Sequence, residues 1–249
     1  MKTAHQSVFT FELGTPEGSL RTTLRIPSEP MRLSDLARSV LRLDDELVSL
    51  GVKKHLPIVG PPSCRKGCTS CCYQLVPMSI PEVFMIHDIV SSMSAARQEE
   101  VLTRFVAAEE QLESLGIDAL SLSDTSQQSI RQLLVEVHRS GIACAFLEKG
   151  SCTIHASRPA ACREYLVSSP PENCAKIGEA IVTRIPLSIR MAHALSGVAA
   201  KVLRRDPLLV PLSFAIAWAE EHEEMGQRTF DAHVLIQMLL EELSAKPNP

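Results

Sequence analysis

The chain has few aromatic side chains and no excess of basic residues. Its 249 residues include seven Phe, two Tyr and one Trp, so the core must consist mostly of aliphatic side chains. Its 25 Lys and Arg stand against 29 Asp and Glu, which gives a net charge of −4. A general nucleic-acid binder normally carries a basic excess. The apolar content of 45% is ordinary for a globular chain. We therefore expect a globular protein that has no nucleic-acid partner.

Long hydrophobic runs are missing as well. The longest apolar stretch, residues 208–219, contains Pro211, whereas a membrane-spanning helix needs about 20 apolar residues. The N-terminal residues 1–11 hold one Lys and no apolar run, unlike a secretory signal peptide. We therefore expect no membrane partner and a cytoplasmic location.

Common catalytic motifs are absent too. The chain has no glycine loop that cradles phosphate, no Gly-x-Ser-x-Gly sequence and no paired-carboxylate signature. Seven scattered histidines are interpreted as surface or core residues: His5, His55, His87, His138, His193, His222 and His233. Whether the protein is an enzyme stays open, and the sequence identifies no protein partner.

The N-terminal residues predict a β-hairpin. Apolar and polar side chains alternate over residues 7–13 and again over residues 20–26, and residues 14–18 have turn composition. Helical periodicity follows, because apolar residues recur at 4-3-4-3 spacing from Leu36 to Leu50.

Helices predominate after the hairpin. We expect Ser34 to cap the first helix and Gly51 to end it. Further helical patterns cover about residues 81–93, 101–115, 130–140, 173–183, 187–204, 211–225 and 229–245. The Leu- and Ala-rich C-terminal helices either pack on the bundle or form the face of a homodimer.

These patterns predict a mainly α fold, an irregular helical bundle with two cysteine-bearing loops and an N-terminal β-hairpin. Residues 1–30 would form the hairpin unit. Residues 31–249 would form the helical domain, with a cysteine-cluster core at about residues 60–175.

Cysteine is what the chain has in abundance. The eight cysteines form two groups: Cys64, Cys68, Cys71 and Cys72, and then Cys144, Cys152, Cys162 and Cys174. In a reducing compartment such groups indicate metal ligands or redox centres more than disulfides, and core packing of spare thiols is the remaining alternative. A c-type haem needs Cys-x-x-Cys-His, and position 72 is a cysteine instead of the histidine.

The spacing of the first group suits a metal ion. The two-residue gap between Cys68 and Cys71 lets a tight turn direct both sulfurs at one ion, about 2.3 Å from each. The three-residue gap between Cys64 and Cys68 places both sulfurs on one side of a helical turn. Adjacent Cys71 and Cys72 do not easily point the same way, so Cys72 either serves a second metal or packs as an apolar residue.

The second group has gaps of seven and nine residues, which fit no regular zinc finger and instead need a folded scaffold to bring the ligands together. Bound thiolates carry negative charge, and nearby cations should offset it: Arg65, Lys66, Arg158 and Arg163. We expect Arg158 and Arg163 to donate hydrogen bonds to sulfur or carbonyl groups around the cofactor. His155 offers an additional nitrogen ligand.

The division of the eight thiolates stays open. They suit two four-sulfur sites, one binuclear site, or one four-sulfur site with four spare cysteines, and we favour one cluster that draws on both groups. Zinc suits a closed thiolate site, and an iron–sulfur cluster also takes four cysteines. The sequence does not separate zinc from an iron–sulfur cluster.

Read together, the two groups resemble a known family. Cys64-x3-Cys68-x2-Cys71-Cys72, followed by Cys152-Thr-Ile and then Arg-Pro-x2-Cys162-Arg, is similar to the CxxCxxCC cysteine-cluster family of the YkgJ type. Its members are described as zinc- or iron-chelating proteins. The sequence departs from the family pattern at the three-residue first gap, at Ala145 in place of a common proline, and at His155 in place of a common tyrosine.

Two enzyme classes share parts of this pattern. Flagellin lysine N-methylases are similar in the cysteine block, which implies an iron–sulfur-dependent methyltransferase or redox activity as the alternative function. Radical S-adenosylmethionine enzymes share the spacing of the first three cysteines. They usually carry an aromatic residue where this chain has Ser70, and their β/α barrel needs strands that we find only at the N-terminus.

Overall fold

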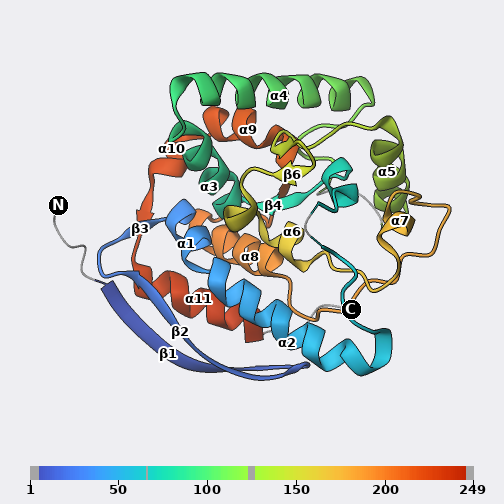
Figure 1. Ribbon diagram of the computed structural model, residues 1–249. Coiled ribbons are helices and arrows are strands. Elements are labelled where there is room, and N and C mark those ends of the chain that lie inside the picture. Colours follow the sequence, from blue (N-terminus) through green and yellow to red (C-terminus); the bar gives the residue numbers. More distant parts are fainter. Residues whose placement is uncertain (1–5, 66, 123–126, 245–249) are drawn as a thin grey trace.

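The computed structural model describes residues 6–65, 67–122 and 127–244 (Figure 1). The α-helices are α1 (Leu33–Ser39), α2 (Leu41–Val59), α3 (Ile80–Ser91), α4 (Ala95–Ser114), α5 (Gln127–Ser140), α6 (Ala160–Glu164), α7 (Pro171–Cys174), α8 (Met191–Leu203), α9 (Ala215–Glu221), α10 (Glu223–Gln227) and α11 (Ala232–Ser244). The strands and short 3-10 helices are β1 (Gln6–Thr15), β2 (Gly18–Pro27), β3 (Met31–Arg32), η1 (Ser70–Tyr73), β4 (Pro77–Ser79), β5 (Leu147–Glu148), β6 (Ser151–Cys152), η2 (His155–Ser157), β7 (Leu209–Pro211), η3 (Leu212–Phe214) and β8 (Thr229–Phe230). The predicted mainly α fold is confirmed.

The predicted N-terminal hairpin is also confirmed. β1 pairs with β2 in antiparallel register, with Phe9 opposite Leu24. The side chains of Leu13, Leu24 and Ile26 are buried, because β1 packs against α11 and β2 packs against α1 and α2. Apolar and polar residues therefore alternate along each strand because one face of the hairpin packs on the helices and the other faces outward.

Helix α3 lies at the centre of the bundle. It packs against α1 on one side and against α8 and α9 on others, and it buries Val83, Phe84 and Ile86. Its first turn is fixed by Ser79, whose backbone N–H donates to Glu82 Oε2 at 2.9 Å, and by Pro81, which is tolerated there. The prediction of a helix from residue 81 is correct.

The prediction that Gly51 ends the first helix is wrong. The expected helix is two helices, α1 and α2, and α2 continues through Gly51 to Val59, where Gly60 with φ of 81° follows it. A Cβ at position 51 would lie 2.3 Å from Leu187 Cδ2. Glycine at this position therefore permits close packing of a remote loop against α2. Ser34 is a buried residue of α1, with Arg32 at the N-cap position.

Other predicted helices are shorter or divided. In place of the helix expected over residues 173–183, only α7 forms, and turns follow it. Gly178 has φ of 82°, which a right-handed helix does not accommodate. The stretch 211–225 contains η3, α9 and part of α10 instead of one helix.

Short strands occur well beyond the N-terminus, contrary to the expectation that strands lie only there. β3 pairs with β8, β4 with β7, and β5 with β6, all antiparallel. Each is two or three residues long, which is too short to show an alternating pattern. β3–β8 and β4–β7 join segments that are remote in the sequence, whereas β5 and β6 form a local hairpin.

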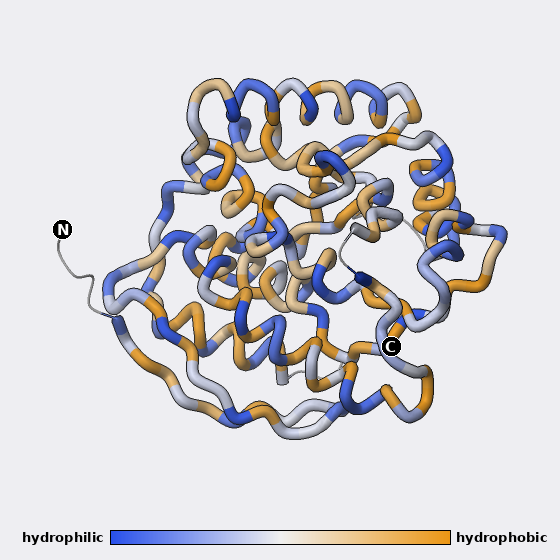
Figure 2. Tube along the Cα trace, viewed as in Figure 1, coloured by the Kyte–Doolittle hydropathy of each residue, from blue (hydrophilic) through white to orange (hydrophobic). Residues whose placement is uncertain are grey.

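The C-terminal helix α11 packs on the bundle, as one of the two alternatives predicted. It contacts α8 and β1 and buries Leu235, Ile236 and Leu239. Along α4 the colours alternate between hydrophilic and hydrophobic in Figure 2, as expected of a helix with one exposed face. Within the described part of the chain, no helix combines the length and the apolar character needed to cross a membrane.

Candidate metal centre

The first cysteine group lies on the loop that leaves α2 and on η1. The backbone N–H of Cys68 donates to the carbonyl of Arg65 at 3.0 Å and closes a turn. The expected helical turn between Cys64 and Cys68 is wrong, because Gly67 has φ of 87° and so cannot continue a right-handed helix. Cys71 and Cys72 follow on η1.

Cys71 and Cys72 are neighbours on η1, and their thiols interact. A hydrogen bond from the Cys72 thiol lowers the pKa of Cys71 to about 7. The same hydrogen bond, together with burial, raises the pKa of Cys72 far above its ordinary value. The tight turn of η1 therefore makes Cys71 the thiol of this pair that gives up its proton more readily.

Two backbone connections bring Cys144 and Cys152 to the first group. The N–H of Cys144 donates to the carbonyl of Cys72 at 2.7 Å. In the small β5–β6 hairpin, Leu147 lies opposite Cys152. Phe146 anchors this hairpin, since its ring is fully buried and makes an edge contact with Phe105 of α4, with centroids 5.3 Å apart.

Backbone N–H groups also point at these two sulfurs. Burial raises the pKa of Cys144 to about 11, while the Phe146 N–H, which donates to its sulfur, acts in the opposite direction. Burial likewise raises the pKa of Cys152, opposed by the Ile154 N–H. Both donors lie two residues after their cysteine, and donors of this kind favour the thiolate form.

Cys162 lies on α6, which a buried carboxylate positions. Glu82 Oε1 accepts a hydrogen bond from the N–H of Ala160 at 2.8 Å, while Glu82 Oε2 accepts from Ser79. Glu82 thus joins the first turns of α3 and α6, and sequence reasoning missed it. The Ser79-x-x-Glu82 capping pattern was the signal that could have found it.

Five cysteines therefore lie together. Burial raises the pKa of Cys162 well above its ordinary value, and Cys144, Cys71 and Cys152 add to that shift. Cys144 and Cys162 likewise contribute to the raised pKa of Cys72. Three of the five pack against the main hydrophobic core. We refer to Cys72, Cys144, Cys152 and Cys162 as the core-side set.

The remaining cysteines gather on the other side of Cys71. Burial raises the pKa of Cys174 to about 11, and Cys64, Cys68 and Cys71 contribute to the increase. The N–H of Val167 donates to the Cys64 sulfur. Helix α7, which carries Cys174, packs against η1. We refer to Cys64, Cys68, Cys71 and Cys174 as the loop-side set.

The two arginines predicted around the cofactor differ in their surroundings. Arg163 is 5% exposed and donates from Nε to the carbonyl of Arg158 at 2.9 Å and from Nη1 to Asp45 at 2.6 Å. It also donates to the carbonyl of Ala156. Arg163 therefore holds the turn between Cys152 and Cys162, and its hydrogen bonds go to carbonyl and carboxylate oxygens.

Arg158 is the cation beside the sulfurs. It lowers the pKa of Cys71, Cys152 and Cys162 electrostatically. Its Nε is buried and has no hydrogen-bond partner among the described residues. His155 is exposed on η2, and its pKa is lowered chiefly by Arg158.

Of the other two predicted cations, Arg65 lies at the edge of the site. Arg65 forms a wide, exposed ion pair with Glu172, with 4.0 Å between Nη2 and Oε1. Such a pair contributes little to stability. Lys66 lies outside the described residues.

The donor set suits a thiophilic metal. All eight cysteines are described, and none of them forms a disulfide. Within the described ranges, no group of three or more His, Cys, Asp or Glu side chains is arranged so that it could hold a metal ion. Protonated thiols at raised pKa do not attract one another, whereas a bound metal ion displaces their protons and draws the sulfurs together. The residues fit such an ion in donor type, since all eight thiols are free.

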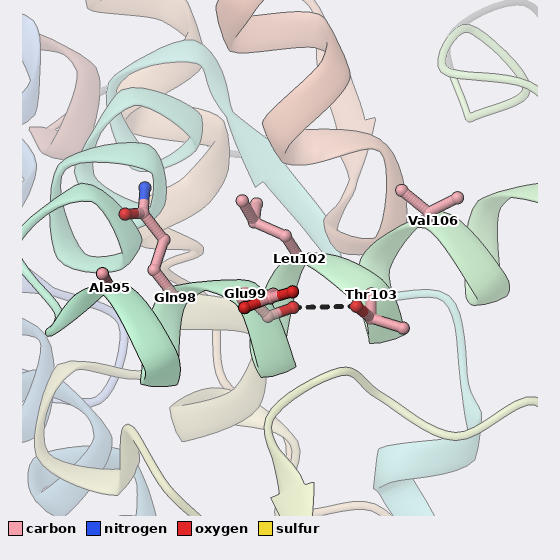
Figure 3. A pocket seen from close by; sticks show the side chains of 6 residues that line it. All are labelled: Ala95, Gln98, Glu99, Leu102, Thr103 and Val106. Carbon is pink, nitrogen blue, oxygen red and sulfur yellow. Dashed lines mark hydrogen bonds between the residues drawn. The ribbon is translucent and has the colours of Figure 1, made fainter.

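One surface depression lacks the walls of a substrate-sized cleft. This depression lies on the outer side of α4 (Figure 3), where Thr103 Oγ1 donates to the carbonyl of Glu99 at 2.9 Å. Its lining residues all belong to that one helix: Ala95, Gln98, Glu99, Leu102, Thr103 and Val106. A single helix face presents no enclosing walls, so this depression is unlike a catalytic pocket.

The comparison with known protein families confirms the predicted resemblance. Residues 63–179 match the model of the CxxCxxCC family, which is described as a "putative zinc- or iron-chelating domain". The matched range contains all eight cysteines. Neither the curated proteins nor the solved structures contain a match to the chain.

Proposed function

From the match of residues 63–179 to this zinc- or iron-chelating family, we propose that the protein binds zinc or an iron–sulfur cluster through its core-side cysteines. Cys72, Cys144, Cys152 and Cys162 are the proposed ligands of this centre. Such a centre belongs in a reducing compartment such as the cytoplasm, where thiols stay reduced.

The observation that carries this proposal is the junction of the two cysteine groups. The hydrogen bond from the Cys144 N–H to the Cys72 carbonyl, at 2.7 Å, joins loops that three helices separate in the sequence. The small hairpin and α6 then add Cys152 and Cys162 to the same place. Core packing alone does not require four thiols at one point.

The surroundings suit the charge of a thiolate centre. Four thiolates around Zn²⁺ leave a net charge of −2, and a cysteine-bound iron–sulfur cluster is also negative. Arg158 supplies a positive charge beside Cys71, Cys152 and Cys162. Its buried Nε–H, which has no partner among the residues that the structure describes, offers a donor to a thiolate sulfur, the kind of contact that orients ligands and raises metal affinity.

Zinc and an iron–sulfur cluster would supply different chemistry at this place. Zinc with four thiolates is a closed site and contributes folding energy. An iron–sulfur cluster would add electron transfer. In both cases this chain's own residues hold the thiolates, bury them beside the hydrophobic core and balance their charge.

Anaerobic purification followed by elemental analysis and an absorption spectrum tests the proposal. We expect at least about one zinc ion or one cluster per chain, colourless for zinc and brown for iron–sulfur. A folded chain with eight free thiols and no metal would overturn it.

A cysteine variant locates the centre. Cys152→Ser should lose most of the core-side metal and melt at a lower temperature, because metal binding is coupled to folding. Thr153→Ser is the matched control, since Thr153 is the exposed neighbour and its hydroxyl contact with Phe146 survives the change. Full metal retention in Cys152→Ser would show that the ligands are wrongly assigned.

A further inference from the structure

The N-terminal hairpin has a long edge without a partner strand. β1 and β2 are each 10 residues long, about twice the usual length of a strand, yet no third strand joins their sheet in the described part of the chain. Among the same residues, no backbone hydrogen bond connects β1 to a segment other than β2. Figure 1 shows the hairpin along the lower border of the molecule, with β1 as its outer strand over most of its length. A free edge of this kind is a template for another strand.

The register indicates which backbone groups of β1 face outward. In an antiparallel pair, every second residue exchanges both N–H···O=C bonds with the residue opposite. Gln6 lies opposite Pro27, which has no N–H to donate, so Gln6 belongs to the set that does not exchange bonds with β2. By alternation Val8, Thr10 and Glu12 belong to the same set, and we expect their N–H and C=O groups to point away from β2.

The edge of β1 lacks the features that usually protect a sheet edge. Proteins block such edges with lysine, proline or a bulge. β1 contains no basic residue and no proline, and its pairing with β2 runs from Gln6 to Thr15 without a bulge. Its one charged residue, Glu12, lies opposite Arg21 of β2. Val8, on the outward face of the strand, is an apolar side chain that is 57% exposed.

The edge of β2 is protected. β2 packs against α1 and α2, and the Thr22 hydroxyl donates to Glu46 of α2. Arg21 and Arg25 are exposed along the strand, and antiparallel pairing of β2 with its own copy about Thr23 would place these two cations opposite each other. Like charges directly opposite destabilise a sheet. Of the two edges of the hairpin, β1 is therefore the open one.

The sequence of β1 is complementary to itself in antiparallel pairing. When Thr10 lies on a two-fold axis, it faces Thr10 of the second copy. Phe9 then faces Phe11 of the second copy, and Val8 faces Glu12. Cross-strand Thr pairs and aromatic pairs are favourable, and the single carboxylate of one strand does not meet the carboxylate of the other. Phe9 and Phe11 already pack against the hydrophobic core of their own chain, so the pairing extends that apolar face across the axis.

We propose that two copies of the chain pair edge to edge through β1, antiparallel about a two-fold axis at Thr10, and form one four-stranded sheet in the order β2-β1-β1-β2. Strand addition of this kind is a common mode of recognition. The contact uses the same surface on both copies, so it closes at two chains. A second copy is the favoured partner because this register pairs residues 6–14 of each strand and opposes no like charges. The inference does not depend on the proposed function.

The mass of the full chain in solution tests the proposal. Under reducing conditions, which exclude intermolecular disulfides, analytical ultracentrifugation should show a monomer–dimer equilibrium in the micromolar range, because the interface is small. Thr10→Lys should raise the Kd of the dimer at least about tenfold, since it places two cations against each other at the axis.

Thr23→Lys is the matched control. Thr23 lies opposite Thr10 on the same exposed face of the hairpin, with 3.3 Å between the two hydroxyl oxygens. Both variants remove this contact and add one positive charge to that face, but only Thr10→Lys changes the proposed edge. Thr23→Lys should therefore dimerise like the wild-type protein.

Hydrogen exchange of the wild-type protein gives a second readout that needs no variant. The backbone amides of Val8, Thr10 and Glu12 should exchange more slowly above the Kd of the dimer than below it, because carbonyl groups of the second copy accept their hydrogen bonds. The amides of β2 should exchange at the same rate at both concentrations. NMR resolves these amides one by one.

Three results would contradict the β1 dimer. A wild-type protein that stays monomeric up to about 1 mM would overturn it and leave the edge to a strand of another protein. Dimers that form equally well in Thr10→Lys and Thr23→Lys would place the interface elsewhere, for instance on the C-terminal helices. Particles larger than a dimer would show that the contact does not close about a two-fold axis.

Discussion

Asp44 is a buried carboxyl group without a full set of partners. It is 2% exposed, and its Oδ2 has no hydrogen-bond partner within the described part of the chain. Burial, together with the negative charges of neighbouring Glu164 and Glu82, raises the pKa of Asp44 to about 9. The protonated form is therefore the one that suits this interior, since a buried charge without a partner is costly.

Replacement of Asp44 should change the pH dependence of stability. The folded-state pKa lies above the ordinary value of 3.8, so the contribution of Asp44 is fully present below about pH 4 and is lost as the pH rises through about 9. In Asp44→Asn the free energy of unfolding should decline less between about pH 4 and pH 9. At pH 8 this free energy should be about 1–3 kcal/mol larger than that of the parent. Urea unfolding at pH 5 and pH 8 measures the difference.

Asp206→Asn is the matched control, because Asp206 is exposed, and we expect its two unfolding curves to follow those of the parent. An Asp44→Asn protein with the parent's pH dependence would mean that Asp44 is ionised in the fold.

Arg158 should determine how tightly the core-side metal is held. Arg158→Gln removes both the positive charge and the buried Nε–H, and loss of such a contact to metal ligands typically weakens affinity about 10- to 100-fold. Competition with a chromophoric chelator measures the affinity. Arg131→Gln, at an exposed position of α5, should bind metal like the parent. Equal affinity in both variants would show that Arg158 does not contribute to metal binding.

Glycines inside helices control how closely elements pack. A Cβ at Gly226 of α10 would lie 2.7 Å from Phe84 Cδ1, and the Phe84 ring is 4% exposed and contacts Trp218, with ring centroids 5.7 Å apart. A ring in that position has little space to move. At Gly51 the obstructing atom is the end of the flexible Leu187 side chain.

Two alanine variants should therefore behave oppositely. Gly226→Ala should destabilise the protein by about 1–3 kcal/mol through overpacking. Gly51→Ala should change stability by less than about 1 kcal/mol, because the helical preference of alanine offsets the displacement of Leu187. Thermal unfolding compares the two. Equal melting temperatures would indicate that the Phe84 ring moves as easily as Leu187.

Elements with strong local signals could be predicted from the sequence, and those set by remote partners could not. The hairpin and α3 have alternation or capping patterns of their own. Gly51 has its role because Leu187 approaches it, and strands of two or three residues exist only because a distant segment pairs with them. The cysteines were identifiable by type and spacing. Their division into sets needed the positions of α6 and α7.

On the scale of the whole molecule, the cysteine region and the helical core are distinct in their sources of stability. The core consists of α1, α3, α8, α9 and α11 packed on one another and on the hairpin. The cysteine loops consist largely of turns and two-residue strands, so metal binding should contribute a larger share of their stability than of the core.

Removal of the metal should therefore loosen the molecule unevenly. After treatment with a strong chelator under anaerobic, reducing conditions, hydrogen exchange should rise over residues 61–76 and 142–185. Exchange in α3 and α8 should stay slow, because their apolar faces remain packed. Hydrogen exchange with mass spectrometry measures both regions in one sample. Uniform acceleration across the chain would show that the metal stabilises the protein as a single unit.

The pairing of β4 with β7 has a consequence for synthesis. Every thiol precedes Leu209–Pro211 in the chain, and α8, which packs against β4 and α6, is also made after the last cysteine. Because translation proceeds from the N-terminus, all eight sulfurs leave the ribosome before the helix and strand that enclose them exist. The nascent polypeptide is thus the state in which these thiols are most open to oxidation, and a cell that supplies metal late would expose them longest.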